Sequence, residues 1–490
     1  MLLQDLLIDV PGVLETKGNM ITQIDSLVID SREEVQNGLF FCISGARFDA
    51  HDFAQQAQKS GCVALIVSRL LESPLPQVRV ENVRSAMAYI SSAFFGHPAR
   101  EMRLFGVTGT KGKTTSSFLL KAILEKAGFK TGLIGTTGNM IGNEKIHSNL
   151  TTPDPIDLHR CFRQMRDAGV EAVSMEVSAH AIDMHRLDGL TFEAGCYTNL
   201  SQDHLDYFNT MENYFNSKKS FFMNGAVLNA ALNVDEETTE KILNEIQIPY
   251  LTYGISANAD VFARDIEISE NGVSFSILLR GLEDMTVHMR MTGMFNVYNA
   301  LAAASMAMIL GIDSPTIKAG LESVRSVPGR IEMLDTNTPY KVILDYSHSP
   351  DALENILTAV RTFTRNRVIA LFGCGGDRDQ GKRPLMGEIG GRLADFSILT
   401  SDNPRTEDPN AILRSIERGI QKTQGRYTII ENRRDAIRFA LSMGQEGDVI
   451  VLAGKGHETY QDVMGVKKPF DEKVVVQELL AEMGEGDAKE

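Results

Sequence analysis

The chain has 490 residues, of which 43% are hydrophobic and 23% are charged, a balance that argues against a disordered or fibrous protein. Its 49 Lys and Arg side chains are outnumbered by 64 Asp and Glu side chains, so the formal net charge is −15. A surface of this sign repels phosphate backbones and argues against nucleic-acid binding, although a local pocket can still be positive. At about 150 residues per domain, this length predicts about three domains.

The sequence shows no signal for a membrane or for secretion. No apolar run approaches the roughly 18–20 residues of a membrane helix, and residues 1–15 lack the basic start of a signal peptide. The cysteines are scattered and odd in number, so they form neither a disulfide framework nor a metal-binding pair, and buried free thiols are expected. We therefore expect a cytoplasmic protein that does not enter a membrane. The cysteines are Cys42, Cys62, Cys161, Cys196 and Cys374.

Short apolar, β-rich runs alternate with helix-period stretches along the chain, which predicts an α/β fold with parallel sheets covered by helices. Residues 1–100 form a first small unit, with a strand at 63–67. A second unit, 101–333, starts with a strand at 103–110 and ends near the Pro-Gly pair in 326–334. Its other strands are expected at 131–137, 171–178, 194–200 and 226–230.

The third unit, 334–490, has expected strands at 342–347, 368–376, 396–402 and 448–456. Each of these strands leads into a polar or glycine-rich turn and then into a helical stretch. Open α/β sheets bind ligands at this edge, beyond the carboxyl ends of their strands.

The strongest local signal is the segment GVTGTKGKTTSSFLLKAIL (106–124), in which a strand, a glycine-rich loop and a helix follow one another. Gly109 and Gly112 let backbone N–H groups approach phosphate oxygens. Lys113 can reach the β- and γ-phosphates, and the hydroxyl of Thr114 or Thr115 can bind Mg²⁺. The strict pattern GxxxxGK[ST] fails by one residue, and an ordinary glycine-rich turn is the alternative. We interpret the segment as a nucleotide-binding loop.

The run GTKGKTT (109–115) resembles GTxGKTT, the nucleotide loop of the Mur ligase family, whose members use ATP to join an amine to a carboxylate. The resemblance extends over nearly the whole chain. It implies three α/β domains: a domain for the UDP substrate (1–100), a central P-loop-type parallel-sheet domain for ATP (101–333), and a Rossmann-like domain for the amino acid (334–490).

An acid and a histidine stand at strand ends of the second unit. Glu176 ends the strand 171–178, and His204 lies between Asp203 and Asp206 in the loop NLSQDHLDYF. A lone histidine is usually structural, but carboxylates at strand ends beside a phosphate loop favour a Mg²⁺ site. The family resemblance implies that Glu176 and His204 are magnesium ligands.

Lys218 lies in the expected helix 211–222, on the face of Tyr214 and Phe222. A lysine on an apolar face usually extends to water. If it points into the site instead, desolvation lowers its pKa and leaves a free amine for CO₂. The resemblance implies that Lys218 is an N6-carboxylysine whose carbamate holds a second Mg²⁺, with the neighbouring Lys219 as the alternative.

The resemblance also implies ATP contacts from the end of the second unit and the start of the third. Asn296 would face the adenine, although an Asn that caps an Ala-rich helix is the alternative. Arg330 suits a phosphate clamp, and Asp345 and His348 would meet ATP from the third domain. The implied ATP-binding residues are Gly109, Thr110, Lys111, Gly112, Lys113, Thr114, Thr115, Asn296, Arg330, Asp345 and His348; the catalytic residues are Lys113, His204 and Lys218; the metal ligands are Thr114, Glu176, His204 and Lys218 as carbamate.

The implied contacts of the UDP-muramoyl-dipeptide rest on the resemblance alone. An arginine is physically sensible there because the acceptor D-glutamate is an anion. Met184 stands where the family often has Gln, so that contact is not expected here. The implied residues are Ser31, Thr151, Thr152, Ser178 and Arg186.

Three polar segments, 374–384, 401–409 and 453–460, each follow an apolar strand of the third unit and so lie along one sheet edge. Their arginines suit carboxylates and their acids suit ammonium groups, as a zwitterionic amino acid requires, although surface loops are the alternative. Pro404 fixes the backbone before Arg405, whose guanidinium favours the extra carboxylate of meso-diaminopimelate over L-lysine. The expected amino-acid contacts are Arg378, Asp402, Asn403, Pro404, Arg405, Gly454 and Glu458.

Together these features imply an ATP- and Mg²⁺-dependent monomer that adds meso-diaminopimelate to the D-glutamate γ-carboxylate of UDP-N-acetylmuramoyl-L-alanyl-D-glutamate. The reaction would pass through an acyl phosphate and serve peptidoglycan precursor synthesis. The alternatives are the L-lysine-adding form and a folate- or cyanophycin-type polyglutamylating ligase, which should lack the TTPDP, DNPR and GKGHE segments together. A P-loop GTPase or kinase would need a base-reading motif such as NKxD, which the sequence lacks.

Overall fold

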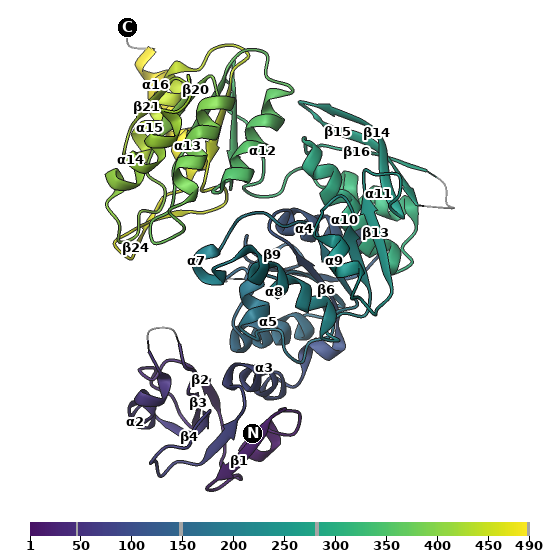
Figure 1. Cartoon of the computed structure of the whole chain (residues 1–490), viewed down its shortest axis with the longest axis vertical. Helices are drawn as coiled ribbons and strands as arrows, with labels where there is room; N and C mark the ends of the chain where they lie inside the picture. The colour runs from purple at the N-terminus through teal and green to yellow at the C-terminus, as the bar shows by residue number, and fades with distance from the viewer. Residues whose placement is uncertain (46–47, 147–149, 280–283, 488–490) are drawn as a thin grey trace.

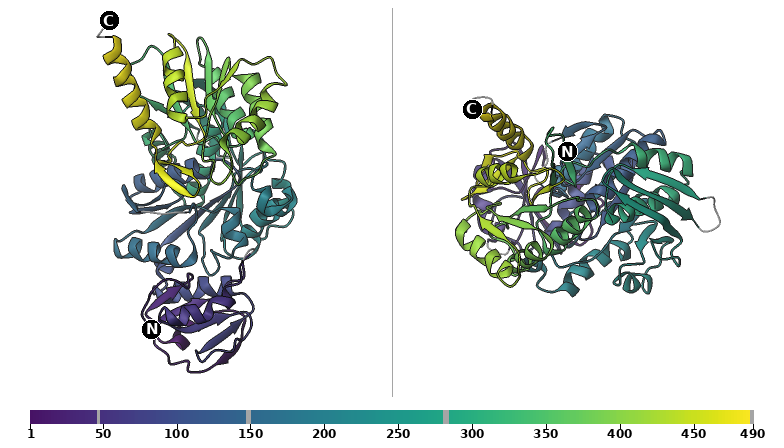
Figure 2. Two further views of the ribbon diagram at one scale, coloured as in Figure 1. Left: turned by 90° about the vertical axis from the view of Figure 1, so that its left-hand side faces the viewer. Right: turned by 90° about the horizontal axis from the view of Figure 1, so that it is seen from above.

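The computed structural model describes residues 1–45, 48–146, 150–279 and 284–487. These residues form three main sheets and a two-stranded hairpin. Figure 1 and the left-hand view of Figure 2 show three units stacked along the long axis, with the N-terminal unit at one end and the C-terminal unit at the other. The α/β fold with a central parallel sheet is confirmed.

The first unit is a five-stranded sheet in the order β1-β5-β4-β3-β2, parallel except for the edge strand β1. Helices α1 and α3 cover one face and α2 covers the other. Its elements are α1 (Leu3–Leu6), β1 (Val13–Lys17), β2 (Ser26–Val28), β3 (Gly38–Phe41), the 3-10 helix η1 (Ala50–Phe53), α2 (Ala54–Lys59), β4 (Cys62–Val67), β5 (Gln77–Val80), α3 (Val83–Phe94) and the 3-10 helix η2 (Pro98–Glu101).

The second unit contains an 11-stranded sheet in the order β16-β15-β14-β13-β12-β11-β6-β10-β7-β8-β9. The strands from β14 to β7 in this order are parallel, and antiparallel strands extend the sheet at both edges. Its elements are β6 (Arg103–Thr108), α4 (Lys113–Lys126), β7 (Thr131–Ile134), β8 (Asn139–Ile141), β9 (Glu144–Ile146), α5 (Pro155–Asp167), β10 (Ala172–Glu176), α6 (Ala179–Asp183), β11 (Ala194–Tyr197), α7 (Leu205–Phe208), α8 (Met211–Met223), β12 (Ala230–Asn233), α9 (Thr239–Leu243), β13 (Tyr250–Gly254), β14 (Val261–Ser269), β15 (Gly272–Leu279), β16 (Met285–Met289), α10 (Met294–Ile309) and α11 (Ser314–Ser323).

Strand β6 is the centre of this sheet and places the predicted nucleotide loop. It pairs with β10 on one side and β11 on the other, and it is buried from Leu104 onward. Helices α4, α10 and α11 pack on one face of the sheet, and α5 and α8 pack on the other. The carboxyl ends of β6, β10 and β11 therefore meet at one edge, beyond which ligands of open α/β sheets bind.

The third unit has a six-stranded sheet in the order β17-β18-β22-β19-β20-β21, parallel except for β17. Strands β19 and β22 are buried along their whole length because α12, α13 and α14 cover one face and α15 and α16 cover the other. Its elements are β17 (Glu332–Leu334), β18 (Lys341–Asp345), α12 (Pro350–Arg361), β19 (Val368–Phe372), α13 (Lys382–Leu393), β20 (Phe396–Leu399), α14 (Pro409–Ile420), β21 (Tyr427–Ile429), α15 (Arg433–Met443), β22 (Val449–Ala453), β23 (Tyr460–Val463), β24 (Val466–Pro469) and α16 (Glu472–Asp487).

One expected strand is misplaced, and several strands were not predicted. The strand expected at 226–230 is β12, Ala230–Asn233, and before it Val227 forms only an isolated bridge with Phe192. Strands β13 to β16 were not predicted; β14, for example, mixes buried and exposed residues rather than forming an apolar run. The division of the chain at 100 and 333 stays a prediction; β17, which belongs to the third sheet, begins just before it at Glu332.

All five cysteines are free and buried, as the sequence predicted. Burial raises the pKa of the Cys196 thiol, and likewise that of Cys374, to about 12. In the part of the chain that the structure describes, no helix is both long and apolar enough to cross a membrane.

His159 of α5 is a buried base without a hydrogen bond. Its side chain is fully buried near Phe162, and neither ring nitrogen has a hydrogen-bond partner among the described residues. Burial lowers the pKa of His159 to about 3, with a further contribution from His97. The folded protein therefore holds His159 neutral at pH values where an unfolded chain protonates it.

We predict that His159→Leu reduces the acid sensitivity of the fold. The pKa of this histidine is about 6.5 in the unfolded chain and about 3 in the folded protein. Between these values only the unfolded state binds the proton. The free energy of unfolding of wild type therefore falls by about 1.4 kcal/mol for each pH unit, from this residue alone. Melting temperatures of both proteins between pH 8 and pH 5 should diverge in favour of the variant as the pH falls. Parallel curves would contradict this role of His159.

Candidate active site

A cavity of about 690 Å³ lies where the loops after β6, β10 and β11 meet the loop before α12 of the third unit. A volume of this size suits a small-molecule ligand. Most of the predicted ATP and metal residues line it, and they come from two domains. The lining includes Thr110, Lys111, Gly112, Lys113, Thr114, Thr115, Glu176, His204, Lys218, Arg330, Asp345 and His348.

The conformation of the nucleotide loop requires its glycines. Gly109 has φ +144°, and a Cβ there would lie 1.9 Å from the Thr198 hydroxyl oxygen. Gly112, directly before α4, has φ +86°, and a Cβ there would lie 2.5 Å from Oδ1 of Asn299. The loop is thus packed so tightly against its supports that side chains at these two positions would displace it.

The residues that hold this loop were missed in the sequence. Asn199 Oδ1 accepts a hydrogen bond from the Lys111 N–H at 2.8 Å, and the Thr198 hydroxyl donates to the Lys111 carbonyl at 2.7 Å. The Thr110 N–H donates to the Asn199 carbonyl at 2.9 Å. Thr198 and Asn199 directly follow β11, a few residues before His204. Their position at the end of a strand was the sequence signal that could have indicated them.

Lys111 and Lys113 line the cavity and are partly buried. Lys113 Nζ donates to the carbonyls of Gly109 and Thr110 at 2.9 and 2.8 Å, and Lys111 Nζ lies 3.4 Å from the Asp203 carboxylate. Burial lowers the pKa of Lys113 to about 8, against the opposing field of Glu176. Burial also lowers the pKa of Lys111, which Asp203 opposes. A bound polyanion would stabilise these charges, so the cavity favours a triphosphate.

Lys218, rather than Lys219, faces the cavity. Its side chain from α8 is buried, its amine donates to the Gly109 carbonyl at 2.8 Å, and Nζ lies 4.2 Å from the centre of the Tyr214 ring. Burial, reinforced by Lys113, lowers the pKa of Lys218 well below its ordinary value. Lys219 instead pairs with Glu245 at 2.8 Å. The surroundings of Lys218 therefore favour its neutral amine.

Glu176 and His204 lie on the same wall of the cavity. Glu176 is buried and accepts hydrogen bonds from the Thr136 N–H at 2.7 Å and the Thr136 hydroxyl at 3.0 Å. Burial lowers the pKa of His204 to about 4, against the opposing charge of Asp203, so its imidazole is neutral near pH 7. Within the described ranges, no three His, Cys, Asp or Glu side chains are arranged to hold a metal ion. The predicted magnesium ligands Thr114, Glu176, His204 and Lys218 all line this cavity, and their role stays a prediction.

Arg330 connects the loop to the third domain. Its Nη2 donates to the Thr114 hydroxyl at 3.1 Å, and its guanidinium lies 4.9 Å from the centre of the Tyr346 ring. Burial raises the pKa of Asp345, against the nearby Arg330, and lowers the pKa of His348 to about 3. The predicted contacts from the third domain thus reach the cavity together.

Asn296 does not line the cavity, although Asn299 on the same helix does. Asn296 donates from Nδ2 to the Thr292 carbonyl at 2.8 Å and accepts a hydrogen bond from Asn299 at 3.1 Å. Asn299 Oδ1 accepts from the Ser116 hydroxyl at 3.3 Å. Asn299 thus lies at the cavity wall, and the contact of Asn296 with ATP stays a prediction.

Four of the five residues expected for the UDP substrate gather beside Glu176. The Thr151 hydroxyl lies 3.1 Å from that of Thr136, and the buried Thr152 hydroxyl donates to the Glu176 carbonyl at 2.8 Å. Thr152 also lies 3.2 Å from Ser178 Oγ, and its carbonyl accepts from Arg186 at 2.7 Å.

The fifth, Ser31, lies apart in the first unit, where its carbonyl accepts a hydrogen bond from the Ser60 hydroxyl at 2.9 Å. Residues 148–149 of the expected loop 148–155 lie outside the described residues.

Two of the three polar loops of the third unit converge on a buried network. Asn403 Nδ2 donates to the Glu458 carboxylate at 2.9 Å, and Asn403 Oδ1 accepts from Lys455 at 3.0 Å. Gly454 has φ +120°, and a Cβ there would lie 2.9 Å from Asp402 Oδ2. Lys455 was not predicted, although it stands inside the GKGHE segment. The network joins Asp402, Asn403, Gly454 and Glu458, as a shared binding site requires.

Arg405 is held by the hairpin β23–β24 and by the third loop. Its N–H donates to the Asp462 carbonyl at 3.1 Å, and its carbonyl accepts from the Met464 N–H at 2.7 Å. Its Nη1 donates to the Gly376 carbonyl at 2.7 Å. Pro404 directly before it is buried, whereas Arg378 is exposed and donates to the carbonyl of Asp377. The structure thus fixes Arg405 firmly and leaves Arg378 outside the network.

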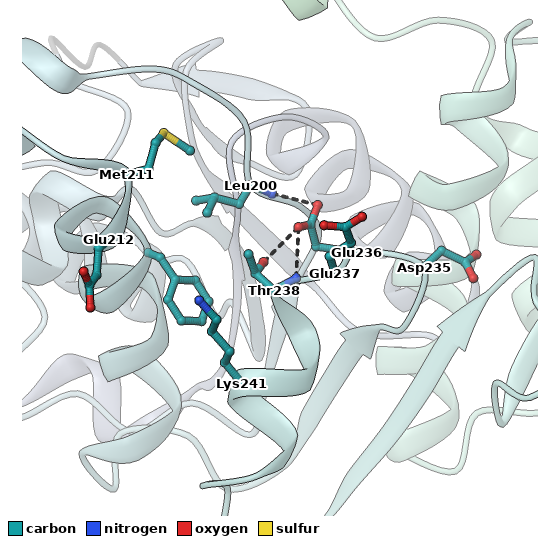
Figure 3. Close-up of a pocket in the computed structure, with 9 residues that line it drawn as sticks. Leu200, Met211, Glu212, Asp235, Glu236, Glu237, Thr238 and Lys241 are labelled. Carbon is teal, nitrogen blue, oxygen red and sulfur yellow. Dashed lines mark hydrogen bonds between the residues drawn. The ribbon is translucent and has the colours of Figure 1, made fainter.

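A second cavity, of about 490 Å³, lies beside the first and shares Leu200, Asp235 and Glu236 with it (Figure 3). An acidic residue of this cavity connects two loops through hydrogen bonds. Glu236 accepts from the Leu200 N–H at 3.1 Å and from the Thr238 hydroxyl at 2.8 Å, which joins the loops after β11 and β12.

We predict that Lys113→Ala weakens ATP binding while the fold is retained, because this side chain serves charge rather than packing. Loss of one charged hydrogen-bond donor to phosphate should reduce affinity about 30- to 100-fold. Calorimetric titration with a non-hydrolysable ATP analogue and a thermal melt measure both effects. Lys126→Ala, at the exposed end of the same helix, is the matched control and should bind normally. Near-normal affinity in Lys113→Ala would remove the nucleotide-site interpretation.

Comparisons with known proteins agree with this architecture. Residues 107–307 match the family model of the Mur ligase middle domain, and residues 329–456 match that of the Mur ligase glutamate ligase domain. A protein of Clostridium botulinum named UDP-N-acetylmuramoyl-L-alanyl-D-glutamate–2,6-diaminopimelate ligase is 43% identical over 468 residues, which cover 94% of this chain and 96% of that protein.

A protein of Geobacillus thermodenitrificans with the same name is 42% identical over 492 residues, 98% of this chain and 100% of its own length. A solved structure with this name superposes with a TM-score of 0.70 at 30% identity and covers 99% of both chains. On these matches, which span all three units, the chain belongs to the Mur ligase family.

Proposed function

We propose that this protein is an ATP-dependent ligase that adds meso-diaminopimelate to the γ-carboxylate of the D-glutamate in UDP-N-acetylmuramoyl-L-alanyl-D-glutamate. It would thereby act in peptidoglycan precursor synthesis. One observation carries the proposal: a single cavity between two domains combines a phosphate loop, a buried reactive lysine and buried carboxylates, beside a polar network suited to an amino acid. The relatives named for this reaction match nearly the full length of the chain.

The triphosphate of ATP lies against the loop 109–115 in this proposal. Lys113 exchanges its hydrogen bonds to the Gly109 and Thr110 carbonyls for the β- and γ-phosphates. Lys111 and Arg330 contribute further positive charge at the same end of the cavity. Asn299 and the residues at the start of α10 are placed to meet the adenine.

Mg²⁺ is held in this proposal by Thr114, Glu176, His204 and a carbamate on Lys218. The donor set fits, because it offers a hydroxyl, a buried carboxylate, a neutral imidazole and an anionic carbamate around one cavity. When bound, Mg²⁺ neutralises charge on the transferring phosphoryl group.

The reaction is a phosphoryl transfer followed by an acyl transfer. A γ-carboxylate oxygen of D-glutamate attacks the γ-phosphorus of ATP, the bond to the β-phosphate oxygen breaks, and ADP leaves with that electron pair. The amine of the incoming amino acid then attacks the acyl carbon, loses a proton and expels phosphate. The protein contributes positioning and electrostatic stabilisation rather than a nucleophile.

The two remaining substrates occupy opposite sides of the cavity in this proposal. The UDP-muramoyl-dipeptide extends from Ser31 to the group of Thr151, Thr152, Ser178 and Arg186, whose guanidinium suits the anionic dipeptide. The amino acid lies in the network of the third domain. The protein acts in the cytoplasm as a monomer on small-molecule substrates.

The decisive experiment measures phosphate release from ATP with UDP-N-acetylmuramoyl-L-alanyl-D-glutamate and a panel of amino acids. Release should require the muramoyl-dipeptide and a diamino acid, and should be fastest with meso-diaminopimelate. Release with tetrahydrofolate and glutamate instead would favour the polyglutamylating alternative.

We predict that Lys218→Ala lowers turnover about 100-fold or more, because the site loses an anionic ligand for the metal. Added acetate should restore part of the activity by occupying the vacated position. Turnover is measured with and without acetate at constant ionic strength. Lys219→Ala, whose side chain pairs outside with Glu245, is the control and should remain active. Full activity of Lys218→Ala in CO₂-free buffer would refute the carbamate.

We predict that Arg405 selects the amino acid. Diaminopimelate carries a carboxylate that L-lysine lacks, and a hydrogen bond between that carboxylate and the half-buried Arg405 contributes about 1.5–3 kcal/mol, so wild type should prefer diaminopimelate by about 10- to 100-fold in kcat/KM. Arg405→Ala should lose most of this preference. Arg414→Ala, an exposed arginine of α14, should keep it. A wild type that prefers lysine would overturn the substrate assignment and leave the ligase assignment in place.

A further inference from the structure

Lys455 is a fully buried lysine at the centre of the polar network in the third domain. Its side chain has no exposed area. It follows β22 and projects between the loop after β20 and its own loop. Its Nζ lies 3.0 Å from Asn403 Oδ1, 3.2 Å from Glu458 Oε2 and 3.6 Å from Asp402 Oδ1. One ammonium group therefore contacts three residues that the sequence assigns to the amino-acid site.

The two carboxylates of this network would repel each other without a cation between them. Asp402 is 5% exposed, and its Oδ1 has no hydrogen-bond partner among the described residues. Burial acts to raise the pKa of Asp402, but Lys455, followed by Arg433, holds it below its ordinary value. Lys455 is thus the largest single influence that keeps Asp402 ionised in the empty site.

The neighbouring charged groups do not replace Lys455. Arg433 is fully buried, pairs with Glu472 at 2.8 Å and donates to the Ala453 carbonyl. Lys382 donates to the His348 carbonyl at 2.8 Å.

The groups that face Glu458 and Lys455 from the other side are aromatic. The Tyr346 hydroxyl lies 3.3 Å from the second oxygen of Glu458, and the Tyr460 ring centre lies 5.8 Å from Lys455 Nζ. Among the described residues, Lys455 is the cation that ion-pairs with both Asp402 and Glu458.

We propose that Lys455 is a positioning residue for the ligase reaction: it holds the Asp402 and Glu458 carboxylates in place, so that together they receive an ammonium group of the incoming amino acid. Asp402 Oδ1, which ion-pairs with Lys455 but has no hydrogen bond to a described residue, is the oxygen that would accept from this ammonium group. The inference rests on the function proposed above. It assigns Lys455 to recognition of the ammonium group, which diaminopimelate and lysine share, and not to the carboxylate that distinguishes them.

Lys455→Met tests this role because methionine keeps most of the volume and removes the charge. The KM for the amino acid should rise about tenfold or more, for diaminopimelate and lysine alike, while the KM for ATP stays unchanged. The acid limb of the kcat/KM profile should move to higher pH, because the pKa of Asp402 rises when the Lys455 charge is removed. Lys467→Met, which changes an exposed lysine of β24, should behave as wild type.

A double variant, Lys455→Met with Glu458→Gln, separates charge from folding. It removes the carboxylate pair, so its acid limb should return toward the wild-type position while the KM stays high. All variants are assayed with the amino acid that wild type uses best. A wild type that ignores diaminopimelate would overturn the proposed substrate, and the variants would still decide the role of Lys455. A wild-type KM and pH profile in Lys455→Met, or an acid limb that stays displaced in the double variant, would overturn the inference.

Discussion

Two lysines, the partly buried Lys113 and the fully buried Lys218, donate hydrogen bonds to the same carbonyl oxygen, that of Gly109. Two ammonium groups this close together are unfavourable, and burial lowers the pKa of each. The carbonyl takes this position because Gly109 has a φ of +144°, a conformation that other residues rarely adopt. The loop therefore holds positive charge that only an anion in the cavity stabilises fully, and the surrounding elements serve to maintain this arrangement.

The third domain joins this arrangement through one continuous series of side chains. Arg330 contacts Thr114 of the nucleotide loop and stacks over Tyr346, whose hydroxyl lies 3.3 Å from Glu458 in the amino-acid network. Tyr346 also stacks with His348 and with His457. The same tyrosine thus forms part of the nucleotide cavity and part of the neighbouring network. The amine attacks the same acyl carbon that the phosphate has activated, so the two sites must lie this close together.

The sequence indicated those parts of the candidate site in which residues of a ligand-binding type directly follow a predicted strand. The loop 109–115, Glu176 and the segments around Asp402 and Glu458 each follow a strand, and parallel strands bring such positions to one edge. Thr198 and Asn199 escaped notice because they act on the backbone of the loop rather than on a ligand. The helix periodicity of 294–309 could not distinguish Asn296 from Asn299, since residues three apart share a face and tertiary packing decides which one reaches the cavity. Strands β14 and β16 mix apolar and polar residues and so lack the apolar runs from which the other strands were predicted.

Lys218 and Lys455, two fully buried lysines, show how partners decide the chemistry of one residue type. Lys218 contacts a carbonyl oxygen and an aromatic ring, and Lys113 is the charged group that most lowers its pKa, so burial and charge both favour the neutral amine that can react with CO₂. Lys455 contacts two carboxylates and an amide oxygen and so can hold them in place. Burial is nearly the same at the two positions, 1% and 0% exposed. Neither role could be read from exposure or residue type alone; each follows from the atoms within about 4 Å of the amine, where unit charges interact most strongly.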